Sequence, residues 1–356
     1  MKILDKPERC QELDQDDMYS RIHRFPEQVE EAVSIGRETD LGDLDSSGIR
    51  NIVVVGLGGS AIGGDLVRSY LAEWLSVPML VVRDYVLPAF VGTESLVLVS
   101  SYSGNTEETL SAYSQAQEQG ARIVALTTGG RLGERAEADG NAVVTLPGGL
   151  MPRAALGYSF FPMLLVLERL GLAPKQDSDI RDTLALLGER KPLLSRSVPV
   201  SENPAKQAAV AWHKHVPVIY GGTVRFDAVA LRIKCQINEN AKQLAFANAF
   251  PEFNHNELVG YGQIEHIADR LSVCILRDTG DHRRTGFRMA IVRKMIADLD
   301  IDVLEMESSG RSPLARMFSL IQWGDFASFY LAMLGGVDPT PIRAIEHLKQ
   351  ELAERS

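Results

Sequence analysis

The sequence lacks the features that mark secreted and membrane-spanning proteins. Its only three cysteines are Cys10, Cys235 and Cys274, which lie far apart in the chain, so they form neither a disulfide framework nor a C-x-x-C metal or redox pair. No apolar run approaches the roughly 20 residues that cross a bilayer. The first residues turn acidic at once, without an apolar signal core. These absences predict a reduced, cytoplasmic protein with no membrane partner.

Positive charge is also scarce. The 356 residues carry a formal net charge of −10, which predicts no affinity for nucleic acid or for an anionic membrane surface. The apolar fraction of 45% and the charged fraction of 24% are typical of a globular chain. The length predicts two domains.

Short continuous apolar runs alternate with helical stretches in the first half of the chain. Runs of this kind fit strands that are buried on both faces of a parallel sheet. The alternation therefore predicts a doubly wound α/β domain with a sheet of five parallel strands, closed by a helix over residues 153–169. The predicted strands are Ile52–Val55, Met79–Val82, Leu96–Val99, Ile123–Leu126 and Ala142–Thr145.

The second half repeats this pattern in a weaker form. Gly221-Gly222-Thr223 follows a predicted strand in the same way as Gly56-Leu57-Gly58-Gly59-Ser60 does in the first half. Such a match in order predicts a duplicated module. The later second-half loop, Arg277–Thr285, lacks a cluster of hydroxyl side chains and is not expected to bind the ligand. The predicted strands here are Val216–Tyr220, Val273–Leu276 and Val303–Met306.

The remaining segments predict the domain boundaries. An apolar stripe from Met18 to Val33, interrupted by Pro26, predicts two short helices in an N-terminal arm. We expect five parts in chain order: a helical arm (1–36), a first α/β domain (37–172), a linker with one helix (173–203), a second α/β domain (204–340) and a C-terminal helix (341–356).

Two first-half loops lie where parallel sheets bind ligands, at the carboxyl ends of strands. The first, Gly56–Ala61, offers glycines and a helix N-terminus to an anion. It also fits a dinucleotide fingerprint or a ligand-free turn. The second loop, Ser100–Thr109, carries more hydroxyls than helix capping needs, which favours a phosphate monoester. The predicted phosphate-binding residues are Gly59, Ser60, Ser101, Ser103 and Thr106, with Gly58 as a further candidate.

These two loops resemble the SIS (sugar isomerase) fold, a flavodoxin-like module that binds phosphosugars. Pro152–Ser159, Asn238–Asn240 and Pro251–Glu257 resemble more particularly the bifunctional phosphoglucose/phosphomannose isomerase family, and the resemblance runs from about residue 20 to the C-terminus. It implies two tandem SIS-type doubly wound domains. It also implies an aldose–ketose isomerase of carbohydrate metabolism, including glycolysis and gluconeogenesis. Such an enzyme interconverts glucose 6-phosphate or mannose 6-phosphate with fructose 6-phosphate through a cis-enediolate, without cofactor or metal.

The resemblance assigns Glu239 as the base that moves a proton between C2 and C1. Glu239 lies in a stretch that we predict to be helical from Ala230 to Ala247, and a glutamate on a helix is ordinarily solvated. Its neighbours Asn238 and Asn240 are poor helix formers, which predicts a helix end or distortion at a cavity.

The other roles also rest on the resemblance. His255, which alone reads as a surface histidine, is implied to open the sugar ring and to reach the active site of a neighbouring subunit in a homodimer. Arg153 is implied to stabilise the enediolate, and Lys349 to assist ring opening. Thr340 is a further candidate for a small hydroxyl residue that admits both C2 epimers.

Two alternatives stay open from the sequence. A non-catalytic sugar-phosphate-binding or regulatory SIS protein would need neither Glu239 nor His255. An amidotransferase module that makes glucosamine 6-phosphate would carry a glutaminase domain with an N-terminal cysteine, which this sequence does not contain.

Overall fold

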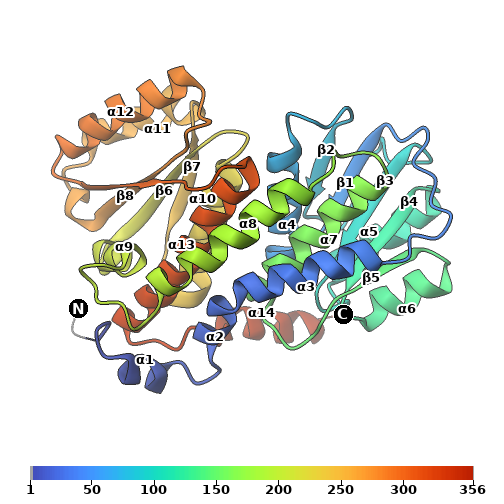
Figure 1. Ribbon diagram of the computed structural model, residues 1–356, viewed down its shortest axis with the longest axis horizontal. Helices are drawn as coiled ribbons and strands as arrows, with labels where there is room; N and C mark the ends of the chain where they lie inside the picture. The colour runs from blue at the N-terminus through green and yellow to red at the C-terminus, as the bar shows by residue number, and fades with distance from the viewer. Residues whose placement is uncertain (1–2, 356) are drawn as a thin grey trace.

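Two parallel β-sheets, one in each half of the chain, organise the computed structural model, which describes residues 3–355 (Figure 1). Residues 1, 2 and 356, the outer ends of the predicted arm and C-terminal helix, lie outside the described residues. The two halves stand side by side, with long helices running between them (Figure 1). The expected α/β fold with two parallel-sheet domains is confirmed.

The first sheet has five parallel strands in the order β2-β1-β3-β4-β5, which is the flavodoxin-like order. All five strands were predicted, and none extends more than one residue beyond its predicted ends. Their side chains are buried on both faces in the central strands, which explains the continuous apolar runs. The strands are β1 (Asn51–Val55), β2 (Met79–Val82), β3 (Ser95–Ser100), β4 (Arg122–Thr127) and β5 (Ala142–Thr145).

Successive residues of β1 enter different cores. Val53 and Val55 pack with α5 and α6 on one face, whereas Ile52 and Val54 pack with α3 (Phe25–Glu38), α4 and α7 on the other. The sheet is therefore covered on both sides, as a doubly wound fold requires. The helices of this half are α4 (Gly58–Leu71), α5 (Glu107–Glu118), α6 (Gly130–Ala138) and α7 (Leu156–Arg169), with a 3₁₀ turn η1 (Pro152–Ala154) before α7.

The second sheet has four parallel strands in the order β7-β6-β8-β9. The prediction missed β7 and was wrong in extending one helix to Ala247. Helix α10 (Asp227–Ala241) ends where Lys242 adopts a left-handed conformation (φ 56°), and the chain then turns into β7. The edge strand β7 is largely half-exposed, so it has no continuous apolar run. The strands are β6 (Val216–Gly222), β7 (Phe246–Phe250), β8 (Leu271–Arg277) and β9 (Asp302–Glu307).

One long helix, α13 (Pro313–Gly335), forms the centre of the second half. It is buried on nearly all sides and packs against α8 (Asp177–Arg190), α9 and α10. No helix within residues 3–355 has both the length and the apolar character needed to cross a membrane. The remaining elements are α9 (Pro204–Trp212), η3 (Glu252–His255), α11 (Glu257–Gly260), η4 (Tyr261–Gln263), η5 (Ala268–Arg270), α12 (Arg283–Ala297) and α14 (Arg343–Ala353).

The N-terminal arm packs on both halves of the protein. The predicted pair of helices that meet near Pro26 is confirmed as α2 (Met18–His23) and α3 (Phe25–Glu38). Helix α3 lies along α7, whereas α2 contacts α13. The other elements outside the two sheets are α1 (Pro7–Leu13), α8 (Asp177–Arg190) and η2 (Pro192–Leu194).

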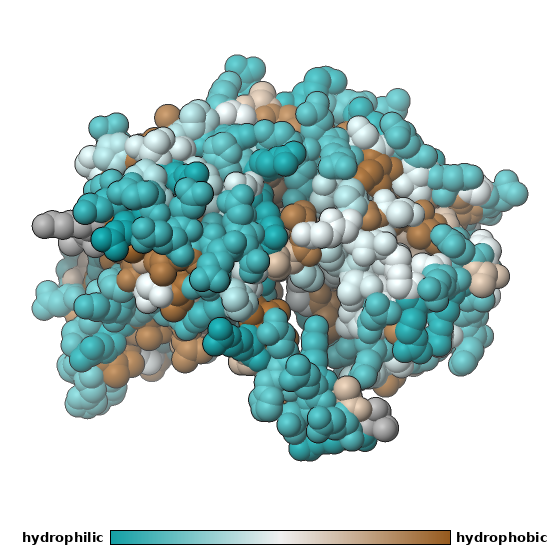
Figure 2. Space-filling view, turned by 90° about the horizontal axis from the view of Figure 1, so that it is seen from below, coloured by the Kyte–Doolittle hydropathy of each residue, from teal (hydrophilic) through white to brown (hydrophobic). Residues whose placement is uncertain are grey.

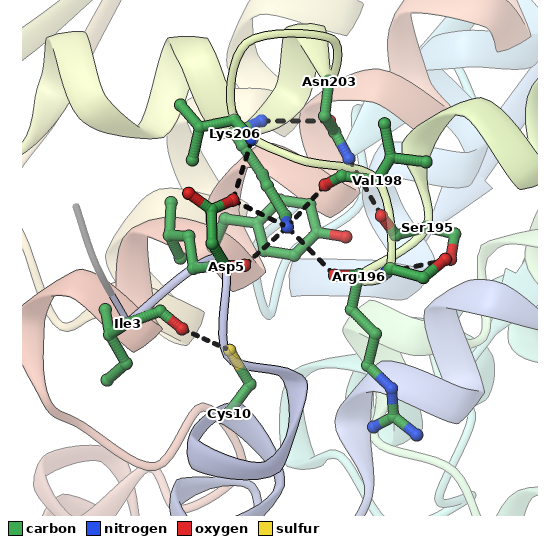
Figure 3. A network of polar contacts seen from close by, with 12 residues as sticks. Ile3, Asp5, Cys10, Ser195, Arg196, Val198, Asn203 and Lys206 are labelled. Atoms are coloured by element: carbon green, nitrogen blue, oxygen red, sulfur yellow. Dashed lines mark hydrogen bonds and ion pairs between the residues drawn. The ribbon is translucent and has the colours of Figure 1, made fainter.

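A buried lysine fastens the start of the arm to the second half (Figure 3). Lys206 of α9 is 0% exposed. Its ammonium donates to the carbonyls of Leu4 at 2.5 Å, Arg196 at 2.9 Å and Val198 at 2.7 Å, and it lies 5.4 Å from the ring centre of Tyr330. Burial lowers the pKa of Lys206. The three carbonyls supply the polar surroundings that a buried ammonium needs.

Candidate active site

The two hydroxyl-bearing loops of the first half meet at the carboxyl edge of its sheet. Because β1 and β3 are neighbours, the loops that follow them lie side by side. The Ser60 hydroxyl accepts a hydrogen bond from the backbone N–H of Tyr102 at 3.3 Å. Ser101 and Thr106 share a hydrogen bond of 3.0 Å between their hydroxyls. Three of the predicted phosphate-binding side chains are thus brought together at one edge.

Ser103 lies at the outer rim of this group. Its side chain is exposed, and its hydroxyl accepts from the N–H of Asn105 at 3.3 Å. Thr106 is the N-cap residue of α5, but its side chain makes no capping hydrogen bond there. A helix N-terminus whose backbone N–H groups have no side-chain cap is suited to binding an anion.

Gly59 joins this edge of the sheet to the turn that carries Arg153. A Cβ atom at Gly59 would lie 2.5 Å from the carbonyl oxygen of Pro152 and 3.1 Å from the backbone nitrogen of Arg153. Only glycine allows α4 and η1 to approach so closely. The Ser159 hydroxyl also donates to the Gly59 carbonyl at 3.3 Å.

Arg153 connects the first half to the second. It is 3% exposed. Its guanidinium donates to the Asn240 side-chain oxygen at 2.8 Å, to the Glu239 carboxylate at 3.4 Å, and to the carbonyls of Pro339 and Thr340 at 2.8 and 2.7 Å. Burial lowers the pKa of Arg153, and the nearby Glu239 charge opposes this shift. The role of Arg153 in a site stays a prediction.

A further set of polar groups holds Arg153 and the end of α10 in place. Arg232 donates to the Arg153 carbonyl at 3.2 Å and to the buried Asp325 carboxylate at 2.7 Å. Asn240 donates to the Ser328 hydroxyl at 2.9 Å. Sequence reasoning missed Arg232, Asp325 and Ser328, because they are separated by about 80 to 175 positions from Arg153 and carry no local motif.

Glu239 occupies the last turn of α10, as the flanking asparagines predicted. Its side chain is 28% exposed, and it faces the buried Arg153. It lines a cavity of about 630 Å³ together with Lys242, Leu244 and residues 337–345 in part. From below, the molecule is hollowed between its two halves, and the C-terminal helix projects beside the hollow (Figure 2). Glu239 is therefore a carboxylate with one cationic partner and access to solvent.

Lys242 is a second cation at this helix end, and the sequence reasoning did not identify it. Its ammonium donates to the carbonyls of Glu239 at 2.6 Å, Asn240 at 3.3 Å and Pro339 at 2.8 Å. Desolvation and the charge of Arg153 lower its pKa to about 8. A lysine directly after a helix end is a recognisable capping signal, but the predicted helix continued past this position.

Thr340 lies against Arg153 with its hydroxyl unused. It is 5% exposed, and its side-chain oxygen makes no hydrogen bond with any residue that the structure describes. Its carbonyl accepts from Arg153. A buried hydroxyl without a partner is uncommon in folded proteins, and here it is available to a ligand.

His255 does not meet Glu239 within one chain. Glu239 lies in the last turn of the helix that precedes β7, whereas His255 lies in η3, just after β7. A strand of five residues spans roughly 16 Å. His255 is exposed.

Lys349 is also not gathered into this group. The cavity beside Glu239 is lined by Arg343, Ala344 and Ile345 at the start of α14, but not by Lys349. Lys349 is exposed, and α14 has no buried residue within Arg343–Ala353. Within residues 3–355, no group of three or more His, Cys, Asp or Glu side chains could hold a metal ion.

Family models match both halves of the chain. Residues 47–138 match the SIS domain. Residues 201–352 match the bacterial phospho-glucose isomerase C-terminal SIS domain.

Curated relatives match nearly the whole chain. A bifunctional phosphoglucose/phosphomannose isomerase of Caldicellulosiruptor bescii is 45% identical over 95% of this chain and 99% of its own. A protein of the same name from Aquifex aeolicus is 34% identical over 88% of this chain and 93% of its own. Among solved structures, the C-terminal domain of glucosamine-fructose-6-phosphate aminotransferase from Francisella tularensis superposes with a TM-score of 0.68 at 15% identity, covering 91% of this chain and 98% of that one.

Proposed function

The chain belongs to the bifunctional phosphoglucose/phosphomannose isomerase family, and we propose that Arg153, Glu239 and the hydroxyl-bearing loops carry the family's reaction in it. The protein is an aldose–ketose isomerase that interconverts glucose 6-phosphate or mannose 6-phosphate with fructose 6-phosphate. The observation that carries the assignment of residues is the buried Arg153. It lies beside the anion-binding edge of one half and bonds to the Glu239 carboxylate of the other.

The phosphate group binds at the carboxyl edge of the first sheet. Gly59, Ser60 and the Ser101–Thr106 loop supply backbone N–H groups and hydroxyls there, with Gly58 beside them. The α4 and α5 N-termini add the positive ends of their helix dipoles. Phosphate binding at this edge places the sugar carbons toward η1 and the end of α10.

Proton transfer takes place at Glu239. Its carboxylate removes the proton from C2 of the open-chain aldose and returns it to C1, and the reverse steps lead back to the aldose. The enediolate between these steps carries negative charge, and the buried guanidinium of Arg153 stabilises it. The carboxylate takes up the proton and returns it on the same face of the enediolate, so a single carboxylate serves both the forward and the reverse reaction.

Ring opening requires a group that moves the proton of the anomeric oxygen. His255 performs this step in the active site of the partner, so the working protein is a homodimer. The position of His255 beyond the far end of β7 supports sharing, since it lies away from Glu239 of its own chain. Lys349 assists ring opening. The free hydroxyl of Thr340 contacts the C2 region and tolerates both epimers.

The state of the cysteines supports the proposed cellular location. The three cysteines, all within the described residues, are free. This state suits the reduced cytoplasm, where the enzyme serves glycolysis and gluconeogenesis.

Mixing of two inactive variants tests the catalytic pair and its sharing between subunits. Glu239→Gln and His255→Ala are unfolded, mixed and refolded together, and activity is followed with glucose 6-phosphate and with mannose 6-phosphate. In a two-fold dimer, about half of the pairs are mixed, and in each mixed pair one site carries both lesions and the other neither, so about a quarter of all sites regain both residues. Activity should therefore return toward that fraction of wild type.

The control is His266→Ala, which changes another exposed histidine of the same region and should be fully active. If both single variants are inactive and verified mixed dimers stay inactive, the shared site is wrong. If the wild-type protein binds but does not convert either sugar phosphate, a non-catalytic role replaces the isomerase.

A further inference from the structure

Lys242 occupies a backbone position that does not favour lysine. It ends α10 in the left-handed conformation, with φ 56° and ψ 28°. Glycine or asparagine is the common residue at such a helix end, because a Cβ atom is disfavoured there. The ammonium of Lys242 makes three hydrogen bonds that a glycine could not make.

The contacts of the ammonium show what it supplies. The carbonyls of Glu239 and Asn240 belong to the last turn of α10, where helical acceptors have no partner within the helix. A cation at this end also interacts favourably with the helix dipole. The third acceptor, the Pro339 carbonyl, comes from the segment after α13.

The Pro339 carbonyl is shared by two cations. Lys242 and Arg153 each donate to it at 2.8 Å. Arg153 also bonds to Glu239 and Thr340, so Lys242 closes a ring of contacts around the site. The ring joins the helix end that carries Glu239 to the segment that carries Thr340.

The charged groups that surround Lys242 come from every element packed around it. Arg153 of η1 disfavours its positive charge, whereas Glu239 of α10 and Asp338 of the segment after α13 favour it. Arg343 at the start of α14 lines the same cavity. Desolvation is the largest influence, and the combined result is a pKa of about 8.

We propose that Lys242 is a positioning residue of the isomerase site, whose ammonium holds the last turn of α10 and the Asp338–Thr340 segment in register with Arg153. The proposal rests on the function given above. Lys242 acts through Glu239 and Thr340 and does not contact the reacting carbons. A neutral amine has two hydrogens to donate, whereas an ammonium has three. Loss of the proton therefore leaves one of the three carbonyls without a donor and loosens the ring.

Three variants separate this role from a merely structural one. Lys242→Gly removes the ammonium but also relieves the left-handed strain, which offsets part of the cost of the lost hydrogen bonds. Lys242→Arg keeps a cation whose charge does not titrate in the working range. Lys214→Gly is the matched control, because Lys214 is also left-handed (φ 69°) and exposed, in the turn between α9 and β6.

The assay measures kcat and KM with fructose 6-phosphate at pH values below and above 8. Lys242→Gly should lose on the order of 10- to 100-fold in kcat with a small change in KM, as expected for a displacement of about 1 Å in a catalytic group. Wild type should lose kcat as the pH rises through about 8. Lys242→Arg should keep part of the activity without that decline, and Lys214→Gly should match wild type.

Hydrogen exchange supplies a readout that does not depend on turnover. Amides in the last turn of α10 and at Thr340 should exchange faster in Lys242→Gly than in Lys214→Gly. Equal exchange in both variants, a kcat for Lys242→Gly within about twofold of wild type, or an unchanged alkaline decline in Lys242→Arg overturns the role of Lys242. If wild type is inactive but the exchange difference is observed, the isomerase function assigned to the site is wrong, whereas the positioning role of Lys242 stands.

Discussion

The contact between Gly59 and Pro152 predicts a large effect from one added methyl group. In Gly59→Ala, the new Cβ lies 2.5 Å from the Pro152 carbonyl oxygen, whereas ordinary contacts begin near 3.4 Å, so the two backbones must separate by about 0.9 Å. Both neighbours are backbone atoms, so a change of side-chain rotamer cannot relieve the clash. The shift moves either the anion-binding end of α4 or the turn that carries Arg153.

A shift of this size acts on activity more than on stability. Overpacking of this kind costs about 1–3 kcal/mol in the free energy of unfolding, which a chain of this size tolerates. A displacement of about 1 Å between the phosphate site and Arg153 lowers kcat/KM on the order of 100-fold. Urea unfolding measures the first effect, and a coupled assay with glucose 6-phosphate measures the second.

The neighbouring glycine provides the control. Gly58 has a left-handed φ of 51°, but a Cβ there meets nothing within 4 Å. Gly58→Ala therefore adds backbone strain without forcing α4 away from η1, and its loss of kcat/KM should be several-fold smaller. If Gly59→Ala kept kcat/KM within about threefold of wild type, the close approach of these two backbones would not set the geometry of the site.

Two further predictions concern the phosphate site and the arm. Ser103→Ala and Thr106→Ala should raise KM more than they lower kcat, because each removed hydrogen bond to a charged group is worth about 1.5–3 kcal/mol; an unchanged KM in both variants would place the phosphate elsewhere. Lys206→Met should lower the free energy of unfolding by about 3 kcal/mol, because the carbonyls of Leu4, Arg196 and Val198 lose their donor. Burial lowers the pKa of Lys206 in the folded state, so the unfolded chain binds the proton more tightly, and wild type should gain stability relative to Lys206→Met as the pH rises toward 10.5. Urea unfolding at several pH values measures both, and equal stability of the two proteins throughout would show that Lys206 does not fasten the arm.

The strands of the first sheet could be predicted from sequence because all five contain continuous apolar runs, which in the central strands reflect burial on both faces. Four or more apolar residues in a row, bounded by turns, have few other structures available in a soluble chain. The strand β7 gave no such signal, since Phe246–Phe250 is an edge strand with half-exposed side chains. Because β7 was not predicted, the predicted helix extended beyond the true end of α10. The prediction therefore placed Lys242 inside a helix that in fact ends just before it.

The site itself was predictable in part. The hydroxyl-bearing loops follow adjacent strands, so local sequence and sheet order suffice to bring them together. The bond between Arg153 and Glu239 depends on how the two halves pack, and no local pattern in either segment encodes it. The close approach at Gly59 is likewise visible only in three dimensions, because a glycine in a loop before a helix has many ordinary explanations.

The two halves share a fold but contribute opposite edges of their sheets to the site. The first half contributes the carboxyl edge, where its hydroxyl-bearing loops lie. The second contributes the end of α10, which leads back to the amino edge of its sheet because helix α10 runs opposite to the strands that it connects.

The carboxyl edge of the second sheet, where duplication would place a second anion site, is already filled by the chain's own acidic side chains. Asp278 is buried, and its carboxylate accepts from Ser308 and from Arg316, the latter at 2.8 Å. A Cβ at Gly222 would lie 2.9 Å from the Asp281 carboxylate. Asp278 thus engages the Ser308 hydroxyl and the Arg316 guanidinium, two donors that a phosphate at this edge would otherwise use. The absence of a hydroxyl cluster in the Arg277–Thr285 loop thus fits a structure in which only one of the two repeated edges is open to a sugar phosphate, and the other half is left free to supply Glu239.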